Sequence, residues 1–298
     1  MSPLRVYVEG IGLWSPQWAD FAALQTLLSG TTPPPPSARP TAATLPPNER
    51  RRAPESVLLA VEVAGQAVAM SGRDPAALAC VFASSHGDQP VTDYMCATLA
   101  QAPLEMSPTR FHNSVHNAAV GYWTIATGCH QPSTAIAAMR ASFGAGLLEA
   151  VTQVIADRRP ALLVGSDTRS SGPLAEVTHC EQPFGCALVL AAEASASTLA
   201  VLELQLTPGL PLTLPDAPLA EAYLSNASAP ALPLLAMLVR GSGRCQLDAA
   251  PMLGLQVDVS PVAAARIDAV QVDAVQVDAK LVDTEQVDAE NIETEQIT

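Results

Sequence analysis

One stretch of the sequence predicts an apolar strand, a sharp corner and a helix, an arrangement in which many α/β enzymes present a nucleophile. Residues 133–138 predict the strand, and residues 142–156 predict a helix rich in Ala, Gly and Leu. The free N–H groups at a helix N-terminus favour an anion at such a corner. Arg140 occupies it instead, and a guanidinium has no usable lone pair with which to attack a substrate.

A permanent cation is unfavourable at this corner. Facing the positive end of a helix dipole costs an exposed cation about 0.3–1 kcal/mol, and burying an unpaired cation costs far more. We therefore expect Arg140 either to reach solvent or to pair with a carboxylate, including one from another chain.

Two other segments place a nucleophile beside a base. Cys129 precedes His130. Ser84 and Ser85 precede His86. Neighbours in sequence seldom face each other as nucleophile activation requires, and neither segment has the G-x-S-x-G pattern of a nucleophile elbow. A Cys- or Ser-based acyltransferase or hydrolase is therefore an alternative interpretation and not the leading one.

Patterns for metals and dinucleotides are weak. His112 and His116 would share a helix face if the helix expected over residues 113–127 begins early enough. No third zinc ligand is evident nearby, so a structural or interface role is favoured over a metal site. The segment "EGIGLWSP" lacks the third glycine of a dinucleotide-binding loop, and it predicts a tight strand-to-helix turn with no cofactor.

The composition is that of a chain with a sizeable core. Of 298 residues, 49% are hydrophobic and 4% aromatic, so aliphatic side chains do most of the packing. The net charge is −14, and residues 266–298 supply half of it, with nine acids against Arg266 and Lys280. The short basic cluster at residues 50–52 is too small to indicate nucleic-acid binding.

The cysteines and the apolar runs predict a cytoplasmic location. Six cysteines without a C-x-x-C pair suit reduced, buried thiols. No secretion signal and no apolar run long enough to span a bilayer is evident in the sequence.

Alternating strands and helices predict an α/β fold, a mostly parallel or mixed sheet packed with helices. Ser15 and Pro16 are expected to begin a helix that runs through Leu28, and residues 31–47 read as a Pro-rich surface loop. The last two strands are expected to be a closing pair. The expected strands are 4–13, 77–85, 133–138, 160–167, 184–193 and 199–206, and the other expected helices are 53–70, 90–101, 113–127, 142–156 and 232–239.

The C-terminal residues repeat with a period of five, as in QVDAV and QVDAK. This period matches neither a helix nor a strand, and the acidic composition favours disorder. We therefore predict a domain over residues 1–255 and an acidic pentapeptide-repeat tail over residues 256–298.

Several segments together resemble the N-terminal half of a β-ketoacyl synthase of the thiolase-like fold. They are "RVYVEGIGLWSP", "FASSHGD", "FHNSVHNAAVGYWTIATGCHQPSTAIAAMRASFGAGLLEAV", "RRPALLVGSD" and "PFGCALVLAAE". The resemblance covers roughly residues 4–206 and lies in the order and spacing of the segments. It implies a thiolase-like half-fold.

The resemblance also implies which catalytic groups are missing. Counted from Pro132, or back from Val164 and Gly165, the position of the family's nucleophilic cysteine falls on Arg140. The family's second half supplies two catalytic histidines, whereas this sequence has only His179 beyond residue 130. The chain is therefore expected to be a pseudo-enzyme without a catalytic residue.

Ketosynthase-like subunits that lack the cysteine are known as chain-length factors, and short versions occur in aryl polyene and xanthomonadin-like biosynthesis. The resemblance implies a heterodimer with an active β-ketoacyl synthase, with acyl carrier protein as a further partner. The helices at 113–127 and 142–156 would then face the partner. The residues expected near this interface or its acyl tunnel are Phe111, His112, His116, Asn117 and Phe143. A stand-alone acyl- or carrier-protein-binding scaffold is the other alternative.

Overall fold

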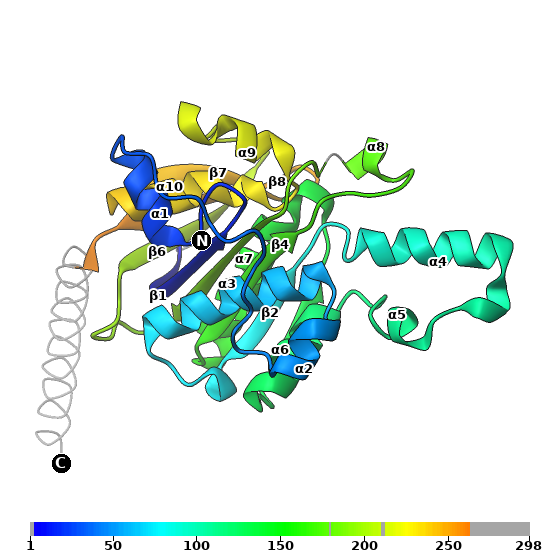
Figure 1. The fold of residues 1–298 in the computed structure, drawn as a ribbon. Helices are drawn as coiled ribbons and strands as arrows, with labels where there is room; N and C mark the ends of the chain where they lie inside the picture. Colours follow the sequence, from blue (N-terminus) through cyan, green and yellow to red (C-terminus); the bar gives the residue numbers. More distant parts are fainter. Residues whose placement is uncertain (1–2, 179, 210–211, 263–298) are drawn as a thin grey trace, which may run out of the picture.

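The structure is a computed structural model that describes residues 3–178, 180–209 and 212–262. Within these residues, eight strands form one sheet in the order β3-β2-β4-β5-β1-β6-β8-β7 (Figure 1). The strands are β1 (Leu4–Trp14), β2 (Ala79–Ala83), β3 (Ser133–Ile136), β4 (Ala161–Asp167), β5 (Phe184–Ala191), β6 (Ala200–Pro208), β7 (Gly243–Ala250) and β8 (Leu253–Ser260). The pentapeptide repeats lie outside the described residues.

The helices cover both faces of this sheet. They are α1 (Phe21–Leu28), α2 (Pro47–Arg52), α3 (Glu55–Ser71), α4 (Gln89–Gln101), α5 (Pro108–His112), α6 (Ala118–Thr127), α7 (Ser142–Asp157), α8 (Ala175–Thr178), α9 (Ala220–Ser225) and α10 (Leu232–Arg240). In the part of the chain that the structure describes, no helix is both long and apolar enough to cross a membrane.

Two hydrophobic cores lie on opposite faces of the sheet. Leu162 and Val164 of β4 belong to the core under α3 and α6, whereas Leu163 belongs to the core under α7 and α10. Successive side chains of a strand point to opposite faces. A continuous apolar run such as β4 is therefore buried on both sides, as the sequence predicted.

The sheet bends around α7. This helix contacts β2 and β4 towards one end of the strand order and β7 at the other end. The backbones come very close there, because a Cβ at Gly144 would lie 2.0 Å from the carbonyl oxygen of Asp248. The C-terminal strands thus cover the start of the helix that follows the Arg140 corner, whereas Thr152, Ile155 and Ala156 near its end are exposed. The partner-facing position expected for residues 142–156 stays a prediction.

The α/β class and the mixed sheet are confirmed, but fewer strands are parallel than the strand–helix alternation predicted. Only β2–β3 and β2–β4 pair in parallel among the described strands, and the other pairs are antiparallel. The last two expected strands, 184–193 and 199–206, were predicted to be a closing pair. This was wrong, because the corresponding β5 and β6 flank β1 on its two sides. The long strand β1 thereby has both of its edges hydrogen-bonded.

The C-terminal part contains more structure than its sequence pattern indicated. The predicted helix near residues 232–239 is α10, but α9, β7 and β8 were not predicted. Strand β8 pairs with β6 through Ser260. Residues 256–260 therefore belong to the sheet and not to the tail.

The first segment differs from its prediction at the start of α1. The helix begins at Phe21, where the Asp20 side chain accepts a hydrogen bond from the Ala23 N–H at 2.8 Å. Ser15 instead accepts hydrogen bonds from the backbone of Gln17 and Trp18 in the preceding turn. Asp20 is thus the N-cap that was assigned to Ser15.

Gly12 lies within β1 and not in the tight turn predicted for "EGIGLWSP". A Cβ at this position would lie 1.9 Å from the carbonyl oxygen of Val63 in α3. The glycine therefore allows the helix backbone to pack directly on the strand.

We predict that Gly12→Ala lowers the free energy of unfolding by about 2–3 kcal/mol, because the new methyl group overlaps helix backbone. Urea unfolding followed by tryptophan fluorescence measures this change. Gly121→Ala in α6 is the control, since its Cβ would meet nothing within 4 Å and alanine favours a helix by about 0.5–1 kcal/mol. Equal midpoints for the two variants would contradict the close approach.

Candidate functional site

Side-chain hydroxyls hold the predicted corner in an unusual backbone conformation. The chain leaves β3 at Ile136 and passes through a 3-10 turn (Met139–Ala141) into α7. Met139 has a φ of 51°, in the left-handed region. Its carbonyl oxygen accepts hydrogen bonds from Ser85 Oγ at 2.5 Å and from Ser142 Oγ at 2.6 Å. The hydroxyls offset a conformation that costs a non-glycine residue about 1–3 kcal/mol.

Arg140 reaches solvent and caps another helix. Its guanidinium donates hydrogen bonds to the carbonyl oxygens of Tyr223 at 3.1 Å and Asn226 at 3.5 Å. These carbonyls lie at the C-terminal end of α9, where the unpaired oxygens favour a cation. Among the described residues, Arg140 pairs with carbonyl oxygens and with no carboxylate. Of the two expectations for this cation, solvent exposure is the one found.

A cavity of about 220 Å³ lies beside this guanidinium. The α7 side contributes Phe143, the α9 side contributes Tyr223, and β7 contributes Gln246 and Asp248. Burial raises the pKa of the Tyr223 phenol, while Arg140 opposes this and Asp248 adds to it. The described residues around the cavity include no cysteine and no histidine.

A buried carboxylate accepts hydrogen bonds from the segments next to the corner. Asp167, at the end of β4, is only 3% exposed. It accepts hydrogen bonds from Ser84 Oγ at 2.8 Å, from the Ser85 N–H at 2.9 Å and from Ser228 Oγ at 2.6 Å. Asn226 Nδ2 donates to the backbone oxygen of Asp167 at 2.8 Å. This network joins the ends of β2 and β4 to the segment that Arg140 caps.

The alternative nucleophiles are not activated. The Cys129 thiol is buried and donates to the Leu78 carbonyl oxygen at 3.3 Å, in the core on the other face of the sheet. The Ser85 hydroxyl donates to the Met139 carbonyl oxygen at the corner. Burial lowers the pKa of His86, with Asp167 opposing the shift. No hydrogen bond joins a thiol or hydroxyl to an imidazole in the described part of the chain.

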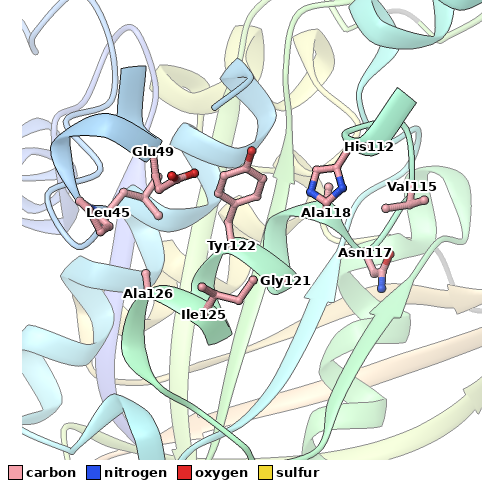
Figure 2. Close-up of a pocket in the computed structure, with 11 residues that line it drawn as sticks. Leu45, Glu49, His112, Val115, Asn117, Ala118, Gly121, Tyr122, Ile125 and Ala126 are labelled. Atoms are coloured by element: carbon pink, nitrogen blue, oxygen red, sulfur yellow. The ribbon is translucent and has the colours of Figure 1, made fainter. Parts of the chain in front are cut away.

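The two spaced histidines do not share a helix face, because residues 113–117 form turns between α5 and α6. His112 ends α5 and lines a pocket beside α6, as Figure 2 shows. His116 contacts the Ser84 carbonyl oxygen at 3.0 Å. No cluster of three potential metal ligands occurs within the described ranges. The helix predicted over 113–127 thus begins five residues later than expected.

The other site residues expected at a partner interface divide into two groups. Phe111 is 60% exposed, and Asn117 is also exposed. Phe143 is only 1% exposed and packs in the core around α7. Phe143 also lines the cavity beside Arg140, and its place near the interface or acyl tunnel stays a prediction.

The sequence pattern did not indicate that Tyr223 and Asn226 bind Arg140, or that Asp167 accepts hydrogen bonds next to the corner. Tyr223 and Asn226 lie in a Pro-rich stretch without periodicity, so nothing in the sequence connected them to the corner. Asp167 had a weak signal, since it is the polar residue that ends an apolar strand. Cys180 also lies here, 2% exposed, with its sulfur accepting the Ala227 N–H. Burial raises the pKa of its thiol, so it is not a ready nucleophile.

Comparison with known families identifies the class of protein. Residues 18–211 match the model of the β-ketoacyl synthase N-terminal domain. This match covers more than half of the chain, so the chain belongs to the β-ketoacyl synthase N-terminal domain family. A search of curated protein sequences finds no match.

Solved structures share the fold over their full length. One is the ketosynthase ApeO in complex with its chain length factor ApeC from Xenorhabdus doucetiae. A chain of that complex matches with TM-score 0.65 and 23% identity, over 86% of this chain and 99% of that chain. The ishigamide ketosynthase/chain length factor matches with TM-score 0.64 and 15% identity, over 88% of this chain and 100% of that one. These likenesses confirm the thiolase-like half-fold.

A complex of AntDE with AntF, described as a type II PKS acyl-carrier protein with its ketosynthase bound to the hexaketide, is also similar. It matches with TM-score 0.66 and 15% identity, over 88% of this chain and 100% of that chain. The fold of this chain therefore recurs in assemblies of ketosynthase-type subunits.

We predict that Asp167→Ala lowers the free energy of unfolding by about 3 kcal/mol, because it leaves several buried donors without an acceptor. Thermal and urea unfolding measure the loss. Asp248→Ala is the matched control, because this exposed carboxylate accepts no hydrogen bond from the described residues, and its removal is expected to change stability by less than about 0.5 kcal/mol. An equal effect of both substitutions would contradict the network.

Proposed function

We propose that this protein is a non-catalytic chain-length-factor subunit that pairs with an active β-ketoacyl synthase in polyene or fatty-acyl chain biosynthesis. The single observation that carries the proposal is the position of Arg140 at the corner, where by resemblance the family's nucleophilic cysteine would lie. Its guanidinium is bound to the carbonyl oxygens of α9, and the adjacent cavity has no thiol or imidazole among its described residues.

The chemistry of the corner supports a role without a covalent intermediate. Acyl-chain condensation through a thioester requires a thiolate at the position that Arg140 takes by resemblance. A guanidinium offers no lone pair for attack on a substrate. This chain therefore carries no growing acyl group, and its partner supplies the nucleophile.

The length of the chain agrees with this proposal. The matched chains in the ApeO–ApeC and ishigamide complexes are covered at 99% and 100%. Both are described as a ketosynthase with a chain length factor. By analogy, a β-ketoacyl synthase is the proposed partner, and acyl carrier protein is a further one, since the AntDE:AntF complex includes a carrier protein.

The free edge of β3 is the proposed seam with the synthase. β3 ends the strand order, so one of its sides has no neighbouring strand within the described residues. Cys80 N–H donates to the Pro132 oxygen and Ser84 N–H donates to the Ile136 oxygen. Since pairing groups alternate along a strand, Ala135 directs its N–H and carbonyl away from β2. Such an unpaired edge is suited to pairing with another chain.

An arm beside this edge adds apolar surface. α4 and α5 project from the body of the molecule in Figure 1. Leu104 is 100% exposed and Phe111 is 60% exposed on this arm. His116 and Asn117 follow at its base. We place Phe111, His112, His116 and Asn117 on the partner side of the chain, whereas Phe143 supports the corner from inside.

A stand-alone acyl- or carrier-protein-binding scaffold is the second candidate, and the apolar pocket beside Tyr122 is the observation that favours it. Co-purification with the synthase separates the two roles. A scaffold would bind acyl groups or carrier protein without retaining a ketosynthase.

We predict that Ala135→Pro weakens binding to the synthase about tenfold or more, because proline removes the outward N–H without breaking the pairing of β3 with β2. Co-purification and titration of the two subunits measure the change. Ala135→Ser keeps the N–H and is the control. Unchanged affinity in a folded Ala135→Pro variant would exclude the β3 edge as the seam.

We also predict that Arg140→Ala weakens heterodimer formation without creating or removing catalysis in this chain, because it releases the carbonyl oxygens of α9. Binding titrations measure the first effect. Labelling with an acyl-chloromethyl probe, followed by mass spectrometry, measures the second. Unchanged affinity would contradict the predicted effect of Arg140 on the heterodimer. A substrate-derived adduct formed on this chain at the turnover rate would overturn the non-catalytic role.

A further inference from the structure

An apolar groove lies beside α6 (Figure 2). It has a volume of about 370 Å³ and is lined mainly by α6 and by the start of α2. Ile125 is 84% exposed and Val115 is 52% exposed along it. Apolar side chains grouped in this way on a surface mark a binding site for another segment or molecule.

Basic residues flank this groove. Arg50, Arg51 and Arg52 form the last turn of α2, where Arg51 and Arg52 are exposed and Arg50 is half-buried. Arg50 follows the lining residue Pro46 by four positions, which places both on one side of the helix. Arg50 donates to the Thr41 carbonyl oxygen and Arg51 donates to Asn48. No carboxylate of the described residues pairs with this cluster. Glu49 is the single acid that lines the groove.

The C-terminal repeats have the complementary chemistry. Their units place Val or Ile directly before Asp or Glu, as at Val272-Asp273 and Val277-Asp278. Each unit therefore offers a small apolar side chain beside a negative charge. Residues 266–298 contain nine acids and two bases, opposite in sign to the cluster at residues 50–52.

The repeats are long enough to reach the groove from the end of β8. Five strand spacings separate β8 from β2, which is about 25 Å across the sheet. The length of α3 adds about 25 Å in the perpendicular direction, so the path is about 35 Å. About 11 extended residues span it. The 36 residues 263–298 leave most of the repeats free to bind.

We propose that the acidic pentapeptide repeats bind the groove between α2 and α6 of their own chain, with Val or Ile in the groove and the following acids on Arg50, Arg51 and Arg52. The tether raises the effective concentration of the repeats at the groove to the millimolar range. The repeats thereby cover an apolar surface that would otherwise be open to other molecules. His112 and Asn117, which we place on the partner side, also line this groove, so the inference is stated for the chain without a synthase.

Zero-length carbodiimide crosslinking of the full chain, without any partner, tests the proposal. The sequence contains a single lysine, Lys280, so the body offers few reactive amines. Arg52→Lys keeps the charge and introduces an amine at the groove. Peptide mass spectrometry then counts the amide links between position 52 and the repeat carboxylates. Arg169→Lys is the control, because Arg169 is also exposed but lies in the loop that follows β4 and does not line the groove.

We expect links at position 52 to be about tenfold more abundant than links at position 169, and to fall severalfold at 0.5 M salt because exposed charges are then screened. Adding Arg50→Gln and Arg51→Gln should also reduce them. Equal yields at both positions, or none at position 52, would overturn the proposal. Mixing isotopically labelled and unlabelled chains separates binding within a chain from binding to a second copy, and predominantly mixed links would also overturn it. Because the synthase is absent, none of these outcomes bears on the proposed heterodimer.

Discussion

The hydrogen bonds to the buried carboxylate of Asp167 are the constraint on which the corner depends. A charge that is 3% exposed must receive hydrogen bonds in place of water, and an uncompensated one would cost several kcal/mol. Its donors come from the end of β2 and from the segment after α9. These segments are distant in sequence, so the carboxylate fixes their relative positions. The corner between β3 and α7 lies above this fixed base.

The position of Arg140 follows from the same network. Asn226 donates to the Asp167 backbone through Nδ2 and accepts from Arg140 through its carbonyl oxygen. One residue therefore connects the buried anion to the exposed cation. The end of α9 compensates the charge that the start of α7 disfavours. A cation can occupy this corner because a second helix ends where the first one begins.

Periodicity predicted most of the N-terminal sheet and little of the C-terminal part. Apolar runs such as β4 and the segment of α7 are signals that local sequence carries by itself. β7 and β8 have alternating, partly polar residues after a Pro-rich stretch, and their pairing with β6 is a long-range contact. The corner and Arg140 could be located from residue types, whereas Tyr223, Asn226 and Ser228 could not, because only the folded chain brings them to it. That Phe143 packs in the core around α7 could not be predicted for the same reason.

The proposed role explains why the corner keeps a strained geometry without a nucleophile. Under the proposed role no covalent chemistry requires the left-handed conformation of Met139, and the hydroxyls of Ser85 and Ser142 hold it there. The conformation directs Arg140 towards α9 and aligns β3 along the edge of the sheet. In a subunit that supports a catalytic partner, the position of Arg140 and the alignment of β3 are sufficient reasons to keep this conformation. The geometry that presents a nucleophile in an enzyme here positions a cation and a strand, β3, that is paired on one side only among the described strands.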